Sequence, residues 1–195
     1  MKKLFMLLAT AAVLFFNANA QVVKEGIKVA QKGDFDLGLM IGVPPVQNAN
    51  MPTISADLSW GLISGFINTK TFGQNGAIDL GVYYGITSYG HKEFGEKHGL
   101  LQNCILARGI FHFQFIENLD TYVGILSGVN LWSWSWEDSN GKNKKNGTDS
   151  KAVFGSFLGA KYYFTEKFGV KLEFEGDFVE GNIPAVATGV TFKFR

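Results

Sequence analysis

The sequence has little cysteine, little histidine and no long apolar run, and each shortage excludes a class of protein. Its 195 residues include one cysteine, Cys104, and three histidines. One cysteine excludes an intramolecular disulfide framework and a metal site built on paired cysteines. The apolar run at residues 4–16 is shorter than the roughly 20 residues that a helix needs to span a bilayer. No helical periodicity of apolar residues follows it.

The first 20 residues have the pattern of a cleaved secretory signal peptide. Two lysines precede the apolar run, and the small-residue sequence Ala-Asn-Ala ends at Ala20. We expect cleavage after Ala20, with an uncleaved anchor as the weaker alternative because the run is short. No cysteine follows the cleavage position, so a lipid anchor is not expected. Residues 21–33 are then interpreted as a periplasmic N-terminal segment.

The mature chain has nearly balanced charges. Removing Lys2 and Lys3 from 18 basic residues leaves 16, against 17 acidic ones, for a net charge of minus one. This balance leaves no excess of positive charge of the kind that binds nucleic acid. No linker divides the remaining 175 residues, so one domain is expected. The glycines are scattered and form no phosphate-binding loop with a lysine.

Alternation of apolar and polar residues with a period of two recurs through residues 34–195 and predicts strands. In the first strand, Leu37 and Leu39 alternate with Asp36 and Gly38. The prolines at 44–45 end this strand, since proline cannot donate to a ladder. The expected strands span residues 34–43, 53–62, 78–87, 104–115, 121–135, 152–164, 168–179 and 185–194.

The chemistry of the two strand faces decides between a soluble barrel and a membrane barrel. A soluble eight-stranded barrel, such as a lipocalin, turns its apolar residues inward. Here the less apolar face carries glycine, serine, threonine and single charges, whereas Phe111, Phe113 and Phe115 crowd the other face. Small residues fit a narrow interior and bulky ones do not. We therefore predict an all-β fold, an eight-stranded antiparallel up-and-down transmembrane β-barrel over residues 34–195.

The connections between the expected strands fit such a barrel, which has short periplasmic turns and longer extracellular loops. With the N-terminus on the periplasmic side, inner turns are expected near 116–120 and 165–167. The inner connection at 67–75 is longer than the pattern prefers. Outer loops are expected at 44–52, 88–100, 136–151 and 180–184, and the longest and most polar of these is 136–151.

The C-terminal sequence ATGVTFKFR resembles the last strand of outer-membrane barrels. In that pattern a glycine is followed after two residues by an aromatic residue, one further residue and a final aromatic residue. Gly189, Phe192 and Phe194 occupy these places. Arg195 follows the final aromatic residue, and Ala187 stands where a polar residue is commoner, so the match is incomplete.

The chain thus resembles the small OmpA/OmpX-type eight-stranded outer-membrane barrels over about residues 33–195, and residues 158–174 resemble their recurrent hairpin. The resemblance implies an integral protein of the outer membrane of a Gram-negative bacterium, surrounded by outer-membrane lipid. It also implies that the barrel-assembly machinery reads the terminal strand during biogenesis. Fold alone is silent about activity.

Nine ionisable residues fall on the expected lumen face, and both signs of charge occur among them. An eight-stranded barrel is just wide enough to be filled by its side chains, so an ion-paired plug is the expected arrangement. A narrow path for water or ions is the alternative. The nine residues are Asp57, Asp79, Arg108, His112, Lys161, Lys171, Glu173, Glu175 and Asp177.

Three tryptophans, Trp132, Trp134 and Trp136, stand at alternate positions where the fifth expected strand leaves the bilayer. Tryptophan is enriched at membrane interfaces because its ring is apolar and its N–H is polar. We expect these side chains at the outer interface, or alternatively in an apolar patch that contacts a partner. Alternation within the strand aims them inward unless a bulge shifts the phase.

Candidate chemistry outside the lumen is sparse. His112 is followed by Phe113 and Gln114, which does not match the His-any-Ser element of lipid A deacylases. His91 and His98 can meet on one loop and bind a metal, although a solvated loop is the stronger interpretation. Lysines in the 136–151 loop can pair with lipopolysaccharide phosphates or serve solubility alone. These lysines are Lys142, Lys144 and Lys145.

These features predict a non-enzymatic barrel that uses no cofactor. Its role is expected to be structural, or one of interaction through extracellular loops or as an accessory subunit of an envelope complex. The alternative is a narrow porin-like channel for ions or small solutes. An enzyme acting on lipid A is the third hypothesis.

Overall fold

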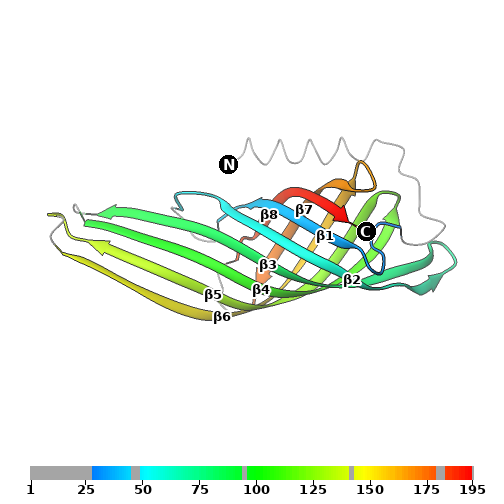
Figure 1. Cartoon of the computed structure of the whole chain (residues 1–195), viewed down its shortest axis with the longest axis horizontal. Coiled ribbons are helices and arrows are strands. Elements are labelled where there is room, and N and C mark those ends of the chain that lie inside the picture. Colours follow the sequence, from blue (N-terminus) through cyan, green and yellow to red (C-terminus); the bar gives the residue numbers. More distant parts are fainter. Residues whose placement is uncertain (1–27, 45–48, 94–95, 141–142, 179–182, 195) are drawn as a thin grey trace.

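The computed structural model describes residues 28–44, 49–93, 96–140, 143–178 and 183–194. These residues form eight strands that pair in chain order and close into a barrel (Figure 1). Every neighbouring pair, including β1 with β8, is antiparallel. The predicted fold class is therefore confirmed. The strands are β1 (Phe35–Gly42), β2 (Thr53–Thr69), β3 (Gly73–Glu93), β4 (Glu96–Ile116), β5 (Leu119–Glu137), β6 (Lys144–Tyr163), β7 (Phe168–Asp177) and β8 (Val186–Phe194).

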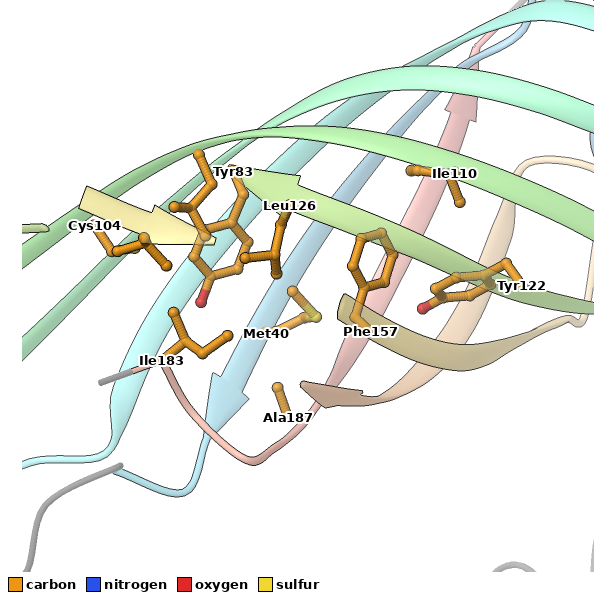
Figure 2. Packing of buried hydrophobic residues seen from close by; sticks show 11 residues of the cluster. Met40, Tyr83, Cys104, Ile110, Tyr122, Leu126, Phe157, Ile183 and Ala187 are labelled. Carbon is orange, nitrogen blue, oxygen red and sulfur yellow. The ribbon is translucent and has the colours of Figure 1, made fainter. Parts of the chain in front are cut away.

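The barrel is apolar outside, and its interior holds buried charged residues together with a cluster of buried apolar side chains that includes Met40, Tyr83 and Leu126 (Figure 2). Along β1 and the first eight residues of β7, exposed or partly exposed apolar side chains alternate with buried residues, which are polar or small except for Met40. Large apolar side chains such as Ile125 and Leu158 are more than half exposed. Charged side chains such as Arg108 and Glu173 are buried. Lys, Arg and Glu are almost never fully buried in soluble proteins unless they are paired, and large contiguous apolar surfaces mark contacts with membranes or partners.

The segment before β1 closes the inner end of the barrel. Val29 and Ala30 are buried, and the amides of Lys28 and Val29 both donate to the side-chain oxygen of Gln114 on β4, at 2.7 and 3.3 Å. Lys193 on β8 donates to the carbonyl of Val29. The described part of the expected periplasmic segment, residues 28–33, thus lies in the barrel mouth. Residues 1–27, including the expected signal peptide, lie outside the described residues.

The outer loops expected at 88–100 and 136–151 are largely strand, so that expectation was wrong. Cα pairing of β3 with β4 continues to Glu93 and Glu96, and pairing of β5 with β6 continues to Glu137 and Lys144. Polar residues do not interrupt a ladder, because its bonds join backbone groups. The alternation of apolar residues marks only the part of a strand that lies in lipid. Figure 1 shows β3, β4, β5 and β6 running on together past the ends of β1, β7 and β8.

We call this extension of β3–β6 the projection; it comprises residues 88–93, 96–102, 131–137 and 144–152. The opposite end of the barrel has the short turns that were expected. Asn118 connects β4 to β5 with a left-handed backbone (φ 62°), which asparagine tolerates better than most residues. Residues 165–167 connect β6 to β7. The expectation of a long connection at 67–75 was wrong. β2 extends to Thr69 and β3 begins at Gly73, and their pairing contains two register shifts.

Gly189 allows the barrel to close between β8 and β1. A Cβ atom at this position would lie 1.9 Å from the carbonyl oxygen of Leu39 on β1. Backbone cannot move aside as a flexible side chain can, so no larger residue fits without separating the two strands. Gly176 on β7 is the matched control, since nothing lies within 4 Å of a Cβ atom placed there.

We expect Gly189→Val to remove most of the folded, heat-modifiable barrel seen on unheated gels, because overpacking costs about 1–3 kcal/mol even where side chains can yield. Gly176→Val is expected to fold like the native chain. Equal folded fractions for the two variants would show that the seam between β8 and β1 tolerates a side chain.

Candidate functional site

Ion pairs cross the barrel interior and join strands that are not neighbours. Lys171 on β7 contacts Asp57 on β2 at 2.7 Å, and Arg108 on β4 contacts Glu173 on β7 at 2.7 Å. Bonds between opposite walls pass through the centre of the lumen. The side chains that make them therefore fill the space that a solute would need.

Glu173 is the hub of this network. Besides Arg108, it accepts a hydrogen bond from the hydroxyl of Tyr122 at 2.8 Å and lies 3.5 Å from the ammonium group of Lys171. The guanidinium of Arg108 also stacks on Phe157, with 3.6 Å between its central carbon and the ring centroid. Charges buried in this way are tolerated because each has a partner of opposite sign.

A second group of ion pairs lies nearer the inner end. The two ring nitrogens of His112 contact Asp79 on β3 at 3.2 Å and Asp120 on β5 at 2.9 Å. Lys161 on β6 contacts Asp36 on β1 at 3.1 Å. His112 is thus held between two carboxylates, one beside each ring nitrogen.

Of the nine residues expected in the lumen, eight are buried there: Asp57, Asp79, Arg108, His112, Lys161, Lys171, Glu173 and Glu175. Asp177 is exposed at the outer end of β7. The sequence interpretation missed several buried partners, because one was assigned to a turn and the others were not counted as functional polar residues. The strand phase places most of them on the lumen face. Five examples are Asp36, Asp120, Tyr122, Tyr163 and Thr191.

The three tryptophans lie on the face of β5 that is continuous with the lumen. The pairing of β5 with β4 and β6 shows no register shift from Thr121 to Glu137, so Trp132, Trp134 and Trp136 keep the phase of the buried Asn130. Beyond the barrel rim this face becomes one side of the projection. Their assignment to the outer interface stays a prediction. The register does decide which face of β5 they occupy, namely the face that carries Asn130.

Each tryptophan has a defined neighbour on β6. The ring of Trp134 lies across Gly147, where a Cβ atom would come within 2.5 Å of it. The ammonium groups of Lys145 and Lys151 lie 5.8 and 5.4 Å from the ring centroids of Trp136 and Trp132. Lysine over an indole face is a favourable cation–π contact.

Charged residues crosslink the tip of the projection. Glu137 contacts Lys97 at 3.1 Å and Lys144 at 3.2 Å. Hydrogen bonds from Lys97 and Lys144 lower the pKa of Glu137. Trp136 donates to Glu96 at 2.8 Å. Of the lysines expected to contact lipopolysaccharide, Lys144 and Lys145 are exposed at this tip, and Lys142 lies outside the described residues.

The outer part of β6 is an open strand edge. Within the described residues, β6 pairs with β7 only from Gly155 inward, and the amide of Phe178 donates to the carbonyl of Phe154 at 2.8 Å. The N–H and C=O of a strand residue point to the same side. Because Phe154 directs its carbonyl toward β7, the other even-numbered residues of β6 direct their N–H and C=O groups to the same side. From Lys144 to Ala152 these groups therefore point away from β5. One of these amides, that of Ser150, bonds to the carboxylate of Asp149 at 2.7 Å.

The histidine pair of the projection is brought together by the backbone. His91 and His98 are Cα partners across the β3–β4 hairpin, and His98 lies 3.6 Å from Glu96. Within the described residues, no group of three or more His, Cys, Asp or Glu side chains is arranged to hold a metal. The same part of the chain contains no helix long and apolar enough to cross a bilayer.

Comparison with models of known families finds no match for this chain, and comparison with curated proteins finds none either. Solved structures do resemble it. The N-terminal β-barrel domain of Pseudomonas aeruginosa OprF is 19% identical with a TM-score of 0.43, covering 84% of this chain and 98% of that one. Neisserial surface protein A is 17% identical with a TM-score of 0.45, covering 83% and 95%.

Ail, the attachment invasion locus protein of Yersinia pestis, is 12% identical with a TM-score of 0.46, covering 84% of this chain and 100% of that one. The likeness is one of fold.

Proposed function

We propose that this chain is an integral β-barrel of the bacterial outer membrane that conducts no solute and presents the projection outside the cell as a platform for interaction. The observation that carries the proposal is the projection itself. Four strands continue past the closed barrel, and β6 leaves its backbone groups open along one edge. An exposed edge is a template for pairing with another chain.

The lumen supports the first half of this proposal. Bonds between opposite walls, such as Lys171 to Asp57 and Lys161 to Asp36, occupy the centre of the barrel. Residues 28–33 cover its inner mouth. The purified barrel is expected to produce no channel steps in planar lipid bilayers. Steady conductance from the native chain would instead support the porin-like alternative.

The exposed apolar belt supports the membrane location, because such a surface needs contact with hydrocarbon. Outer-membrane lipid is its proposed surrounding, and the barrel-assembly machinery is the proposed reader of Gly189, Phe192 and Phe194. At the projection tip, Lys144 and Lys145 are proposed to bind lipopolysaccharide phosphates. Each ammonium group has three N–H donors, and the contact of Lys144 with Glu137 and that of Lys145 with the ring of Trp136 do not use all of them. No part of this proposal requires catalysis or a cofactor.

A photo-crosslinking residue tests the platform in living cells. At Thr148, whose backbone faces the open edge of β6, we expect a discrete adduct with an envelope protein. Leu158 on the same strand faces lipid and is the matched control, which should give none. Replacing residues 134–146 by a two-residue turn should remove the Thr148 adduct and leave the barrel folded. Identical patterns at Thr148 and Leu158 would contradict a specific platform.

A further inference from the structure

The open edge of β6 has a defined length. At its inner end the amide of Ser150 already donates to the carboxylate of Asp149 at 2.7 Å. At its outer end the amide of Asp138 donates to the carbonyl of Asn143 at 3.0 Å, which closes the hairpin between β5 and β6. A partner strand can therefore bond to the residues between these ends that direct N–H and C=O outward. They are Lys144, Asn146 and Thr148.

The side chains of the other phase lie on the face that carries the tryptophans, because cross-strand partners share a face of the sheet. The pairs are Trp136 with Lys145, Trp134 with Gly147, and Trp132 with Asp149. Lys145 and Asp149 are both exposed. Along the edge, this face therefore presents a cation, a position without a side chain and an anion, in that order.

The position without a side chain is occupied in part by a ring from the neighbouring strand. A Cβ atom at Gly147 would lie 2.5 Å from a carbon of the Trp134 indole, so this ring reaches from β5 across β6. Trp134 is 43% exposed. A side chain from a strand added beside β6 would meet the ring across Gly147. Aromatic side chains suit this place, because they pack edge to face or offset against an indole.

The ladder geometry decides which side chains would lie opposite each other. In an antiparallel addition, Lys145, Gly147 and Asp149 take positions that are not hydrogen bonded, where Cα atoms are only about 4.5 Å apart and side chains are closest. Opposite charges at such positions stabilise a strand pair, and like charges destabilise it. The complement of this edge is therefore an acid opposite Lys145, an aromatic residue opposite Gly147 and a base opposite Asp149.

We propose that the open edge of β6 binds an extended protein segment as an antiparallel strand, with a basic, an aromatic and an acidic residue at alternate positions in that order from the N-terminus of the segment. This binding rests on the proposed role of the projection as a platform and adds the chemistry of its partner. The base lies opposite Asp149, and the acid lies opposite Lys145.

Synthetic peptides blocked at both ends test the order of charges. The probe is Thr-Lys-Thr-Phe-Thr-Glu-Thr with a fluorescent dye, and its fluorescence anisotropy reports binding to the full barrel in lipid nanodiscs. The control has the same composition in the order Thr-Glu-Thr-Phe-Thr-Lys-Thr. We expect the probe to bind at least about fivefold more tightly, because the control places like charges opposite Lys145 and Asp149.

Variants of the chain test the individual contacts. Lys145→Glu should weaken the probe about fivefold and should instead favour a peptide with lysine in place of its glutamate. Lys167→Glu makes the same charge change in the exposed β6–β7 turn at the other end of the barrel and should alter neither affinity. Trp134→Ala should remove the advantage of phenylalanine over alanine at the centre of the peptide.

N-methylation of the probe tests the backbone ladder. The two threonines beside the phenylalanine lie opposite Asn146 and Thr148, so their N–H groups point to β6 and their methylation should abolish binding. The N–H of the phenylalanine points away from β6, and its methylation should leave most of the affinity. These comparisons depend on no variant of the chain.

Two results would overturn this inference. Equal binding of the two peptides of the same composition would show that the edge does not read the order of charges. An equal effect of methylation at threonine and at phenylalanine would show that no strand is added. An adduct at Thr148 in cells together with either result would leave the platform in place and remove this partner chemistry, whereas loss of that adduct would remove the platform itself.

Discussion

Arg108→Met is expected to lower the free energy of unfolding by about 3–5 kcal/mol, the usual cost of leaving a buried charge without its partner. Methionine keeps an apolar contact with Phe157, so the lost charge dominates the effect. Glu173 would lose the cation that lies 2.7 Å from it and would keep only Lys171, at 3.5 Å, as a charged partner among the described ion pairs. The measurement is urea unfolding from phospholipid vesicles, followed by tryptophan fluorescence.

Two further variants make this prediction specific. Lys167→Met removes a cation from the exposed β6–β7 turn and should change stability by no more than about 0.5 kcal/mol. Arg108→Met combined with Glu173→Gln should recover much of the loss, because it restores the native charge balance of the interior. If Arg108→Met and Lys167→Met unfold alike, the cross-lumen pairs do not hold the barrel together.

Ile125→Lys is expected to cost about 2–4 kcal/mol, the penalty for lysine on the lipid face near the bilayer midplane. Ile125 is 60% exposed near the middle of the membrane part of β5. In a water-soluble protein the same substitution would be neutral. Folding yield and unfolding free energy in vesicles measure the effect.

Ser133→Lys is the matched control, because it lies on the same face of the same strand but in the projection. Its expected cost is about 0–1 kcal/mol, the value found at or beyond the membrane interface. Equal tolerance of lysine at positions 125 and 133 would contradict the bilayer assignment. A larger cost at 133 than at 125 would place the membrane around the projection instead.

The fold was predictable because its signal is local. Asp36 and Leu37 point to opposite faces of one strand whatever the rest of the chain does, so alternation revealed strands, their number and their phase. The tight turns near Asn118 and Thr165 were predictable for the same reason. Strand ends in the projection were not, since polar residues such as those at 144–150 carry no apolar alternation and still pair through the backbone.

The lumen residues were predictable as a set but not as pairs. Phase placed Arg108 and Glu173 inside, yet strands β4 and β7 are not neighbours in the sheet. Which acid meets which base depends on barrel closure and register, which combine all eight strands. The same is true of the three tryptophans, whose facing depended on whether a bulge interrupts β5.

By itself the sequence predicted export and determined an all-β chain with an apolar exterior, because side-chain alternation and composition act over a few residues. Only the tertiary structure decided that ion pairs cross the lumen and that residues 28–33 close its inner mouth. These features arise between residues far apart in the chain. Closing the ring brings them together, and no short-range pattern encodes the distance across a barrel.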